Sequence, residues 1–142
     1  MIEVTQLQRD NLAIAKARWS TIPQRNVSTD LMTWRYRTLI DSHNKPPTCD
    51  TIACFGGWCA WIPEFMEQGV KARTNGSPYL EGSSRESSED VSEALFGDRY
   101  MFSFRGDYKI DDDREYNSDW QIVMNRIDYL RYSSEVVQDV TL

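Results

Sequence analysis

The sequence predicts a mainly α fold of the α+β class: one compact helical domain, residues 1–142, built around a buried central helix. Two observations support this prediction. Hydrophobic residues make up 40% of the chain and aromatic residues 12%, so it can bury a core without disulfides. Apolar residues also recur at helical spacing in separate segments, whereas stretches that alternate as strands do are short. We therefore expect mainly helices, with at most a small antiparallel sheet beside them.

The first helix is predicted from about residue 5 to residue 20. Thr5 and Gln8 have the spacing of a capping box, in which each side chain bonds the backbone amide of the other residue. The apolar residues that follow fall near one helical face. The helix should stop before Pro23, because the residue that precedes a proline is pushed away from helical dihedrals.

The central helix is predicted in the segment CDTIACFGGWCAWIPEFMEQG. Asp50 or Thr51 can cap its start, and apolar residues surround its axis, as in a helix that is buried on most sides. A glycine in a helix interior costs roughly 1 kcal/mol relative to alanine. The pair Gly56 and Gly57 therefore indicates that another backbone or a large ring packs there closely. Pro63 should kink the helix or make it restart.

The remaining segments between helices carry weaker signals. Residues 27–41 suit either a strand or a helix, and the alternation of apolar and polar residues slightly favours an extended segment. The turn chemistry of residues 41–48 predicts a loop. Residues 71–90 are rich in Gly, Ser, Thr and charge, which predicts an exposed loop. Residues 133–142 are expected to form a tail or a short final turn.

Three further elements are predicted in the second half of the chain. A short helix should run from about 88 to 96, with Gly97 as its C-terminal cap. Alternating aromatic residues predict a strand over 100–106. A last helix is expected over about 118–132, because Ser118 begins a second capping box and the apolar residues that follow share one face.

Charge and hydropathy exclude several classes of function. Sixteen Lys and Arg stand against 22 Asp and Glu, a formal net charge of −6. This acidity disfavours direct nucleic-acid binding, which depends on cations that release counterions from phosphates. It suits association with a basic protein surface, including one that normally holds DNA. The chain has neither a signal-peptide pattern nor a run of about eighteen apolar residues, so we expect a cytoplasmic protein without membrane contact.

Three cysteines, Cys49, Cys54 and Cys59, are spaced by five residues. An odd number is a poor basis for a disulfide framework and suits a reducing cytoplasm. On a helix, Cys54 and Cys59 would point roughly 140° apart, so they cannot hold one metal ion together. We therefore expect buried core thiols, with no metal and no cofactor. Cys49, near the predicted helix start, leaves open an unrecognised Cys-dependent enzyme with His43 as its base.

Residues 49–58 resemble a motif of a loose group of short, mostly uncharacterised proteins of bacteriophages and bacterial chromosomes, written Cys-Gly-Thr-x-Ala-Cys-x-x-Gly-Trp. The matching residues are Cys49, Thr51, Ala53, Cys54, Gly57 and Trp58. Asp50 stands where the group has glycine. Weaker similarities are Met32 with Trp34, Leu95 with Phe96, and Arg126 to Asp128. The resemblance implies a phage or mobile-element setting and a shared helical fold, but no general activity.

An acidic stretch follows the predicted strand and is the candidate partner-binding surface. Its members are Asp107, Asp111, Asp112, Asp113 and Glu115. Calcium binding is disfavoured there, because Tyr116 stands where a calcium loop needs glycine and no glutamate follows at the twelfth place. A solvated acidic loop is able to meet a basic partner.

An alternative site would bind a small, nucleotide-like ligand between the central helix and an aromatic segment. Backbone amides at the expected helix start would hold an anion, and arginines would complete a phosphate site. The residues of this alternative site are Trp34, Arg35, Tyr36, Arg37, Asp50 and Thr51, with Arg99 or Arg105 as further arginines. The competing interpretation is that Asp50 already supplies the negative charge and that the arginines are ordinary surface residues.

Three functional hypotheses result. The leading one is a non-enzymatic accessory protein of phage or mobile-element type that binds and inhibits a host protein of defence or nucleic-acid metabolism. The second is a protein that binds or sequesters a small nucleotide-like ligand. The third is the Cys-dependent enzyme. The oligomeric state and the identity of the partner do not follow from the sequence.

Overall fold

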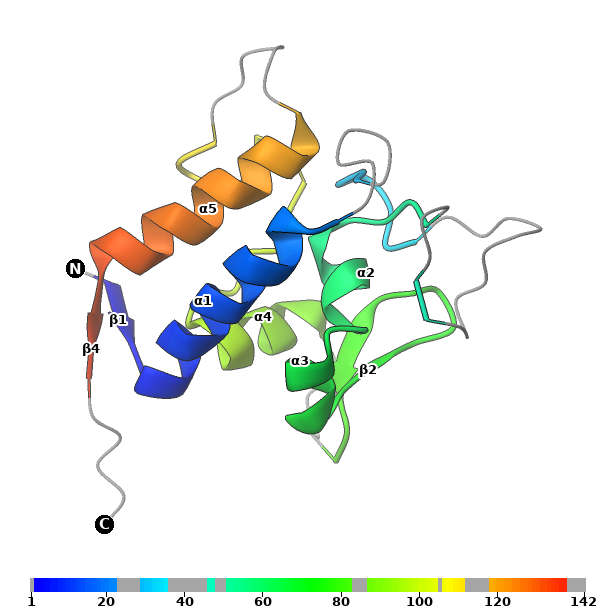
Figure 1. The fold of residues 1–142 in the computed structure, drawn as a ribbon, viewed down its shortest axis with the longest axis horizontal. Helices are drawn as coiled ribbons and strands as arrows, with labels where there is room; N and C mark the ends of the chain where they lie inside the picture. Colours follow the sequence, from blue (N-terminus) through cyan, green and yellow to red (C-terminus); the bar gives the residue numbers. More distant parts are fainter. Residues whose placement is uncertain are drawn as a thin grey trace.

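The structure is a computed structural model that describes residues 2–22, 29–35, 46–47, 51–82, 87–104, 106–111 and 118–137. Within these ranges lie five α-helices, one parallel pair of strands and one antiparallel pair (Figure 1). The predicted mainly helical α+β fold is confirmed. No helix of the described part of the chain combines the length and apolar composition needed to cross a membrane.

The two long helices, α1 (Gln6–Ser20) and α5 (Asp119–Ser133), pack against each other as one layer. The predicted capping box of α1 is present, since the Gln8 amide donates to Thr5 Oγ1 (3.1 Å) and the Thr5 amide donates to Gln8 Oε1 (2.8 Å). Two tryptophans lock the layer. The indole N–H of Trp19 donates to the carbonyl of Trp120 (3.0 Å), and that of Trp120 donates to the carbonyl of Trp19 (2.8 Å).

A parallel pair of strands joins the outer ends of this layer. β1 (Ile2–Val4) pairs with β4 (Ser134–Val136), and the Val137 amide extends the pairing to Val4 O (2.8 Å). Figure 1 shows the two strands side by side at one end of α1 and α5. The expected tail or short turn after α5 is therefore wrong for its first residues. Strands of three residues carry too little alternation to be detected in a sequence.

The predicted central helix is two short helices, α2 (Phe55–Cys59) and α3 (Pro63–Glu67). The restart at Pro63 is confirmed, and the proline occupies the first turn of α3, where its missing N–H costs nothing. The predicted start at residues 50–51 is wrong. The residues before α2 pair with an earlier segment instead: the Asp30 amide donates to Ala53 O (3.1 Å) and the Cys54 amide to Thr33 O (2.9 Å).

Twin glycines let the earlier segment approach α2. A Cβ at Gly57 would lie 1.7 Å from the carbonyl oxygen of Trp34, and a Cβ at Gly56 would lie 2.5 Å from a carbon of the Trp34 ring. Both distances are far inside van der Waals contact. The expectation that a backbone or a large ring packs on this pair is confirmed, because one residue supplies both.

Aromatic rings connect α2 to the other helices. Phe55 is fully buried, meets Trp19 of α1 edge to face (5.1 Å between centroids) and stacks on Phe96 of α4 (Ser88–Phe96; 5.6 Å). Phe65 of α3 contacts Phe96 in turn (5.6 Å). Edge-to-face and offset contacts at these distances are favourable beyond the area they bury. The buried helix at the centre of the fold is thus α2, shorter than expected.

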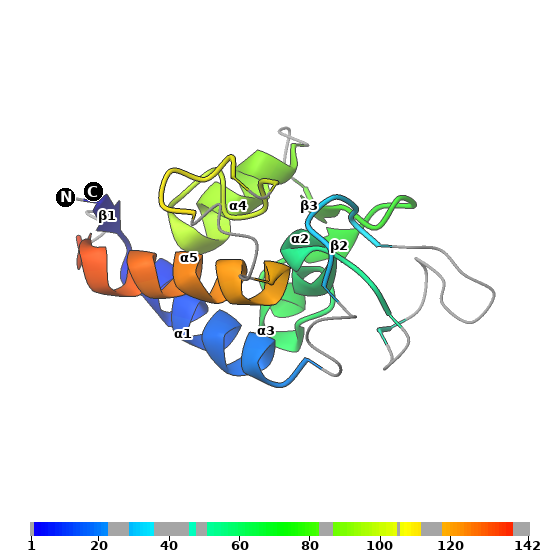
Figure 2. The same ribbon diagram turned by 90° about the horizontal axis from the view of Figure 1, so that it is seen from above.

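Helix α4 lies against the layer of α1 and α5 (Figure 2). It begins after the N-cap Ser87 and ends at Gly97, whose φ of +81° gives the left-handed cap that was predicted. Gln8 of α1 donates to the carbonyl of Glu93 (3.0 Å), so the start of α1 holds the last turn of α4.

The exposed loop expected over 71–90 is wrong for its first half. β2 (Val70–Ala72) and β3 (Pro78–Leu80) form an antiparallel hairpin there, which confirms the small antiparallel sheet. Its turn contains Gly76 at a φ of +89°, and the Asn75 side chain accepts a hydrogen bond from the backbone N–H two residues later (3.0 Å). The turn residues dominate this segment, and strands of three residues are too short to show an alternating pattern. The sequence of the hairpin therefore resembles that of a plain loop.

The strand predicted over 100–106 is also wrong, because its described residues form turns. The Ser103 amide donates to Tyr100 O (3.1 Å) and the Asp107 amide to Phe104 O (3.1 Å). Tyr100 and Phe104 are about half exposed, while Phe102 is buried. The aromatic alternation therefore does not mark one buried face.

The first prediction concerns the contact at Gly57. We expect Gly57→Ala to lower the free energy of unfolding by about 3 kcal/mol, the upper end of overpacking costs, because its Cβ meets backbone that cannot yield. Gly69→Ala is the control: its φ is +96° and its Cβ would meet nothing within 4 Å, so it should lose about 1 kcal/mol. Urea denaturation of both variants measures the difference, and equal losses would contradict the packing argument.

Candidate functional site

The turns after α4 are held by one buried arginine of α5. Arg126 has no exposed side-chain surface, and it donates to both carboxylate oxygens of Asp111 (2.9 and 2.6 Å). Its remaining N–H groups donate to three backbone carbonyls, those of Met101 (3.2 Å), Ser103 (2.8 Å) and Phe104 (3.0 Å). The guanidinium thus satisfies carbonyls that a strand would have offered to a neighbouring strand.

A second set of contacts attaches these turns to α4. Tyr108 lies against Arg126, with the guanidinium carbon 5.2 Å from the ring centroid, and its hydroxyl donates to Asp98 Oδ2 (3.0 Å). Burial, and then the charge of Asp98, raises the pKa of Tyr108 well above its usual value, so the phenol stays a donor. Ser92 of α4 donates to the Asp98 carbonyl (2.6 Å) and accepts from the Met101 amide (3.1 Å).

The position of Asp111 corrects the predicted acidic surface. Its side chain is 1% exposed and is the counter-ion of Arg126, so it cannot meet a partner. Asp107 is exposed, as expected. Asp112, Asp113 and Glu115 lie outside the described residues.

An aromatic cleft of about 640 Å³ opens between the start of α4, the turns that follow α4, and the segment before α2. Its aromatic residues are Trp34, Tyr100, Phe102 and Phe104. Tyr100 and Phe104 are 53% and 51% exposed, and Trp34 meets Phe102 edge to face (6.4 Å between centroids). Two half-exposed aromatic side chains in one concave site are typical of a binding surface.

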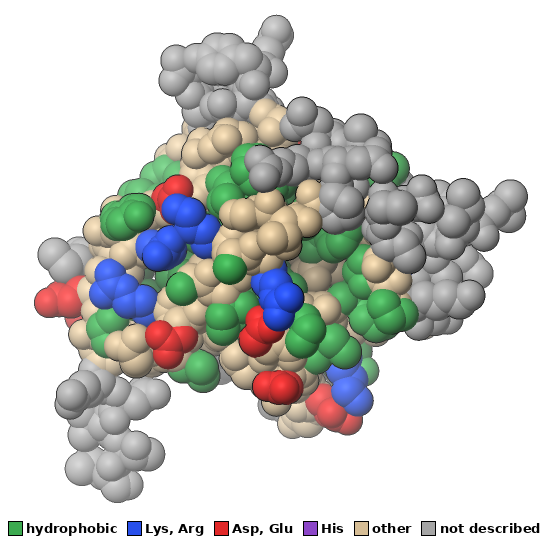
Figure 3. Space-filling view, viewed as in Figure 1, with side chains coloured by type: hydrophobic (Ala, Val, Ile, Leu, Met, Phe, Trp, Pro, Cys, Tyr) green, Lys and Arg blue, Asp and Glu red, His purple; other side chains and the backbone are tan. Residues whose placement is uncertain are grey.

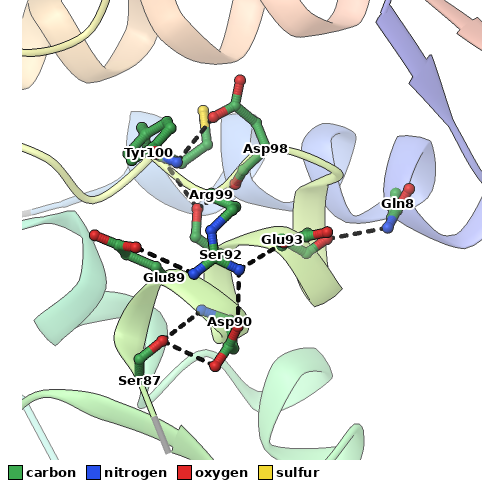
Figure 4. Close-up of polar contacts among 10 residues, drawn as sticks. Gln8, Ser87, Glu89, Asp90, Ser92, Glu93, Asp98, Arg99 and Tyr100 are labelled. Carbon is green, nitrogen blue, oxygen red and sulfur yellow. Dashed lines mark hydrogen bonds and ion pairs between the residues drawn. The ribbon is translucent and has the colours of Figure 1, made fainter. Parts of the chain in front are cut away.

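The charged members of the lining are Glu89, Arg99 and Asp107. Arg99 is the centre of what we call the acidic cluster, in which three carboxylates of α4 surround it: Asp90 (2.8 Å), Glu93 (2.9 Å) and Glu89 (3.1 Å) (Figure 4). These hydrogen bonds, to Glu93 first, raise the pKa of Arg99. Counted over these four described residues alone, three carboxylates and one guanidinium give the cluster a formal charge of −2.

The cluster determines which ligands suit the cleft. Three N–H groups of Arg99 already donate to carboxylates of the same molecule, and those carboxylates would repel a phosphate, so Arg99 is a poor phosphate receptor. The carboxylates of Glu89 and Asp107 add negative potential beside the aromatic rings. The cleft therefore favours a cationic or apolar group over an anionic one.

Opposite charges are mixed elsewhere on the surface. Figure 3 shows basic and acidic side chains close to one another on the face formed by α1 and α5. Lys16 contacts Asp128 at 2.7 Å, and Arg18 pairs with Glu64, which lowers the pKa of Glu64. Such exposed pairs leave little net field on this face.

The predicted nucleotide-like site is not assembled by the described residues. Trp34 lines the aromatic cleft, but Arg35 is 2% exposed and its guanidinium lies over the Trp61 ring (5.9 Å to the centroid). Thr51 is buried, and it precedes α2 in non-helical backbone instead of capping a helix. Tyr36, Arg37 and Asp50 lie outside the described residues.

The described cysteines are core thiols, as expected. Cys54 and Cys59 are free and buried. Burial raises the pKa of Cys54 to about 12, although amides at the start of α2 oppose the shift, and it raises the pKa of Cys59 well above its usual value. Neither sulfur is a thiolate at neutral pH, so neither is an activated nucleophile. Trp58 is partly buried against the core, and Cys49 lies outside the described residues.

Sequence reasoning missed the acidic cluster. Its signal was present, because the predicted helix over 88–96 places Glu89 and Glu93 four residues apart on one face. Arg99 gave no signal of its own, since only the turn at Gly97 brings it back over that face.

Replacement of Asp111 tests the buried ion pair. Asp111→Ala should lower the free energy of unfolding by about 3–5 kcal/mol, because it leaves the Arg126 charge buried without its counter-ion. Asp107→Ala, which removes an exposed carboxylate from the same turns, should change it by no more than about 0.5 kcal/mol. Urea unfolding followed by tryptophan fluorescence measures both. Similar values would mean that Asp111 is not the counter-ion.

The buried thiols predict a dependence on alkaline pH. A raised pKa in the folded state means that the folded protein holds its thiol protons while the unfolded chain loses them above about pH 8.5. The contribution of Cys54 is therefore complete below about pH 8.5 and is lost as the pH rises towards about 12. Unfolding curves at pH 8, 9 and 10 should show falling stability, with a shallower fall in Cys54→Ala. Parallel pH profiles would contradict the shift.

No protein-family model, curated protein or solved structure matched this chain. The resemblance of residues 49–58 to a motif of phage and bacterial proteins therefore stays a prediction. The function has to be argued from the aromatic cleft, the acidic cluster and the buried residues that position them.

Proposed function

We propose that this chain is a non-enzymatic accessory protein, of phage or mobile-element type, that binds and inhibits a host protein with a basic surface. One observation carries the proposal: two half-exposed aromatic side chains line a cleft of about 640 Å³ beside a cluster with a net charge of −2. The resemblance of residues 49–58 supplies the phage or mobile-element setting.

The chemistry of the cleft supports binding over catalysis. Of the described residues that line it, none is a histidine, a cysteine or a lysine, the usual sources of a general base or a nucleophile near neutral pH. The hydroxyl of Ser87 caps α4 and donates to Asp90 (2.9 Å), so it is already used in the fold.

The acidity of the chain supports a partner with a basic surface. The net charge of −6 and the acidic cluster would steer a basic surface towards the cleft and speed association at low salt. The aromatic side chains would then supply the desolvated centre of the interface, where most binding energy resides. An inhibitor of this kind occupies the surface that the host protein uses for an acidic ligand such as DNA.

The second candidate function is a small-ligand binder. The volume of the cleft falls in the range of small-molecule sites, and Trp34 offers a ring for stacking. Arg99 argues against a phosphorylated ligand, because its donors bind three carboxylates. A panel of nucleosides and nucleotides separates the candidates: a rise in melting temperature with a nucleotide at millimolar concentration favours the second.

The proposed function is tested by affinity capture from bacterial lysate, followed by binding and activity assays with the purified captured protein. The double variant Glu89→Gln/Glu93→Gln brings the acidic cluster to neutrality without a change of shape. It should raise the dissociation constant by about three- to tenfold at low salt, as expected for two exposed charge contacts. The unmodified chain should inhibit its partner at a fixed stoichiometry.

A matched control removes the same charge elsewhere. Glu3→Gln/Glu135→Gln changes two exposed carboxylates on the paired strands β1 and β4, neither of which lines the cleft or belongs to the acidic cluster. This variant should bind as the unmodified chain does. Equal loss in both double variants would mean that net charge alone acts, and unchanged binding in both would remove the acidic cluster from the interface.

A further inference from the structure

The aromatic cleft contains ring faces over which no cation of the described residues lies. Among the described residues, no cation lies over the rings of Trp34, Tyr100 or Phe104, although the protein pairs cations with other rings, such as Arg73 with Tyr79 (5.5 Å). Ring faces attract cations through their quadrupole, and they do so more strongly where water is excluded.

A carboxylate stands beside these rings. Asp107 is exposed and lines the cleft, and its side chain forms no ion pair or hydrogen bond with any described residue. Glu89 stands at the same cleft and gives one oxygen to Arg99 (3.1 Å). Arg99 lines the same cleft, but three of its N–H groups donate to carboxylates of α4 (Figure 4), and it forms no ion pair with Asp107.

We propose that the cleft receives an arginine side chain from an extended basic segment of the partner protein, stacked on Tyr100 and Phe104 and paired with Asp107. A planar guanidinium suits this site better than a compact ammonium, because it stacks on rings and bonds a carboxylate with two parallel N–H groups. The inference rests on the proposed function, since it names the group of the basic partner that enters the cleft.

The occupant is argued from charge and from the walls of the cleft. A second copy of this chain would bring an acidic molecule with net charge −6 against an acidic rim, which repulsion disfavours. The walls of the cleft are preorganised. Arg126 fixes the carbonyls of Ser103 and Phe104, and the twin glycines seat Trp34, so the site needs little reordering when it fills.

Peptide titrations test the inference directly. The probes are three nonapeptides of sequence Gly-Ser-Gly-X-Gly-X-Gly-Ser-Gly with X as arginine, lysine or citrulline, the uncharged analogue of arginine. The titrations follow amide and indole NMR signals of the uniformly labelled full chain at low salt. The arginine peptide should shift signals at the cleft and bind at least fivefold more tightly than the lysine peptide. The citrulline peptide should cause no saturable shift.

Variants locate the site. Tyr100→Leu/Phe104→Leu keeps apolar side chains but removes the ring faces, and Asp107→Asn removes the charge. Each variant should raise the dissociation constant of the arginine peptide at least fivefold. Tyr132→Leu, at a ring on α5 that is 76% exposed, is the matched control and should leave affinity unchanged. Unchanged melting temperatures establish that each variant is folded.

Other outcomes overturn the inference. Equal binding of the citrulline peptide would make the cleft an apolar docking site. Free arginine that binds as tightly as the peptide would make it a small-molecule site, and concentration-dependent dimerisation that protects Tyr100 would make the occupant a second copy. The proposed function and this inference can fail separately. If a captured partner binds through Glu89 and Glu93 but this chain binds none of the peptides, only the proposed arginine contact is refuted. If the arginine peptide binds but no captured protein is inhibited, the proposed inhibitory function is refuted.

Discussion

The fold around the cleft depends on a single side chain, the guanidinium of Arg126. A fully buried charge is costly unless its hydrogen bonds are satisfied, and here one carboxylate and three backbone carbonyls satisfy them. Because those acceptors are spread over residues 101–111, the chain has to wrap around the arginine. The wrapped turns then direct Tyr100 and Phe104 outwards, where they form one wall of the cleft.

The wall of the cleft that Trp34 forms depends on two residues without side chains. Gly56 and Gly57 let the Trp34 carbonyl and ring lie against α2, so a segment that precedes α2 by about twenty residues becomes part of the site. A side chain at Gly57 would push that segment outwards, because its Cβ alone would lie 1.7 Å from the carbonyl oxygen of Trp34. Packing at these glycines thus determines where one wall of the aromatic cleft lies. The segment that follows Cys54 therefore contributes to the proposed binding site through its backbone packing, without any reaction at the sulfur.

Local patterns predicted the helices, and long-range contacts produced what the sequence did not reveal. Thr5, Ser118 and Gly97 fixed helix ends, because capping depends on neighbours within four residues. The burial of Asp111 depends on Arg126, fifteen residues away, and an aspartate in an acidic run resembles a solvated one until its partner is located. Of the residues that line the cleft, sequence reasoning singled out Trp34, Arg99 and Asp107, but for different sites. It did not predict that Tyr100 and Phe104 are exposed there, since the exposure of an aromatic side chain depends on how remote segments of the chain meet.

The pairing of Ile2 with Ser134 gives the domain a circular organisation. This contact closes a loop that runs from residue 2 to residue 134, and the conformational entropy of that loop is lost before the contact can form. Strand β1 therefore cannot pair until β4, which follows α5, has been synthesised. During translation, the backbone edge of β1 therefore stays unpaired with β4 until residues 134–136 have been synthesised.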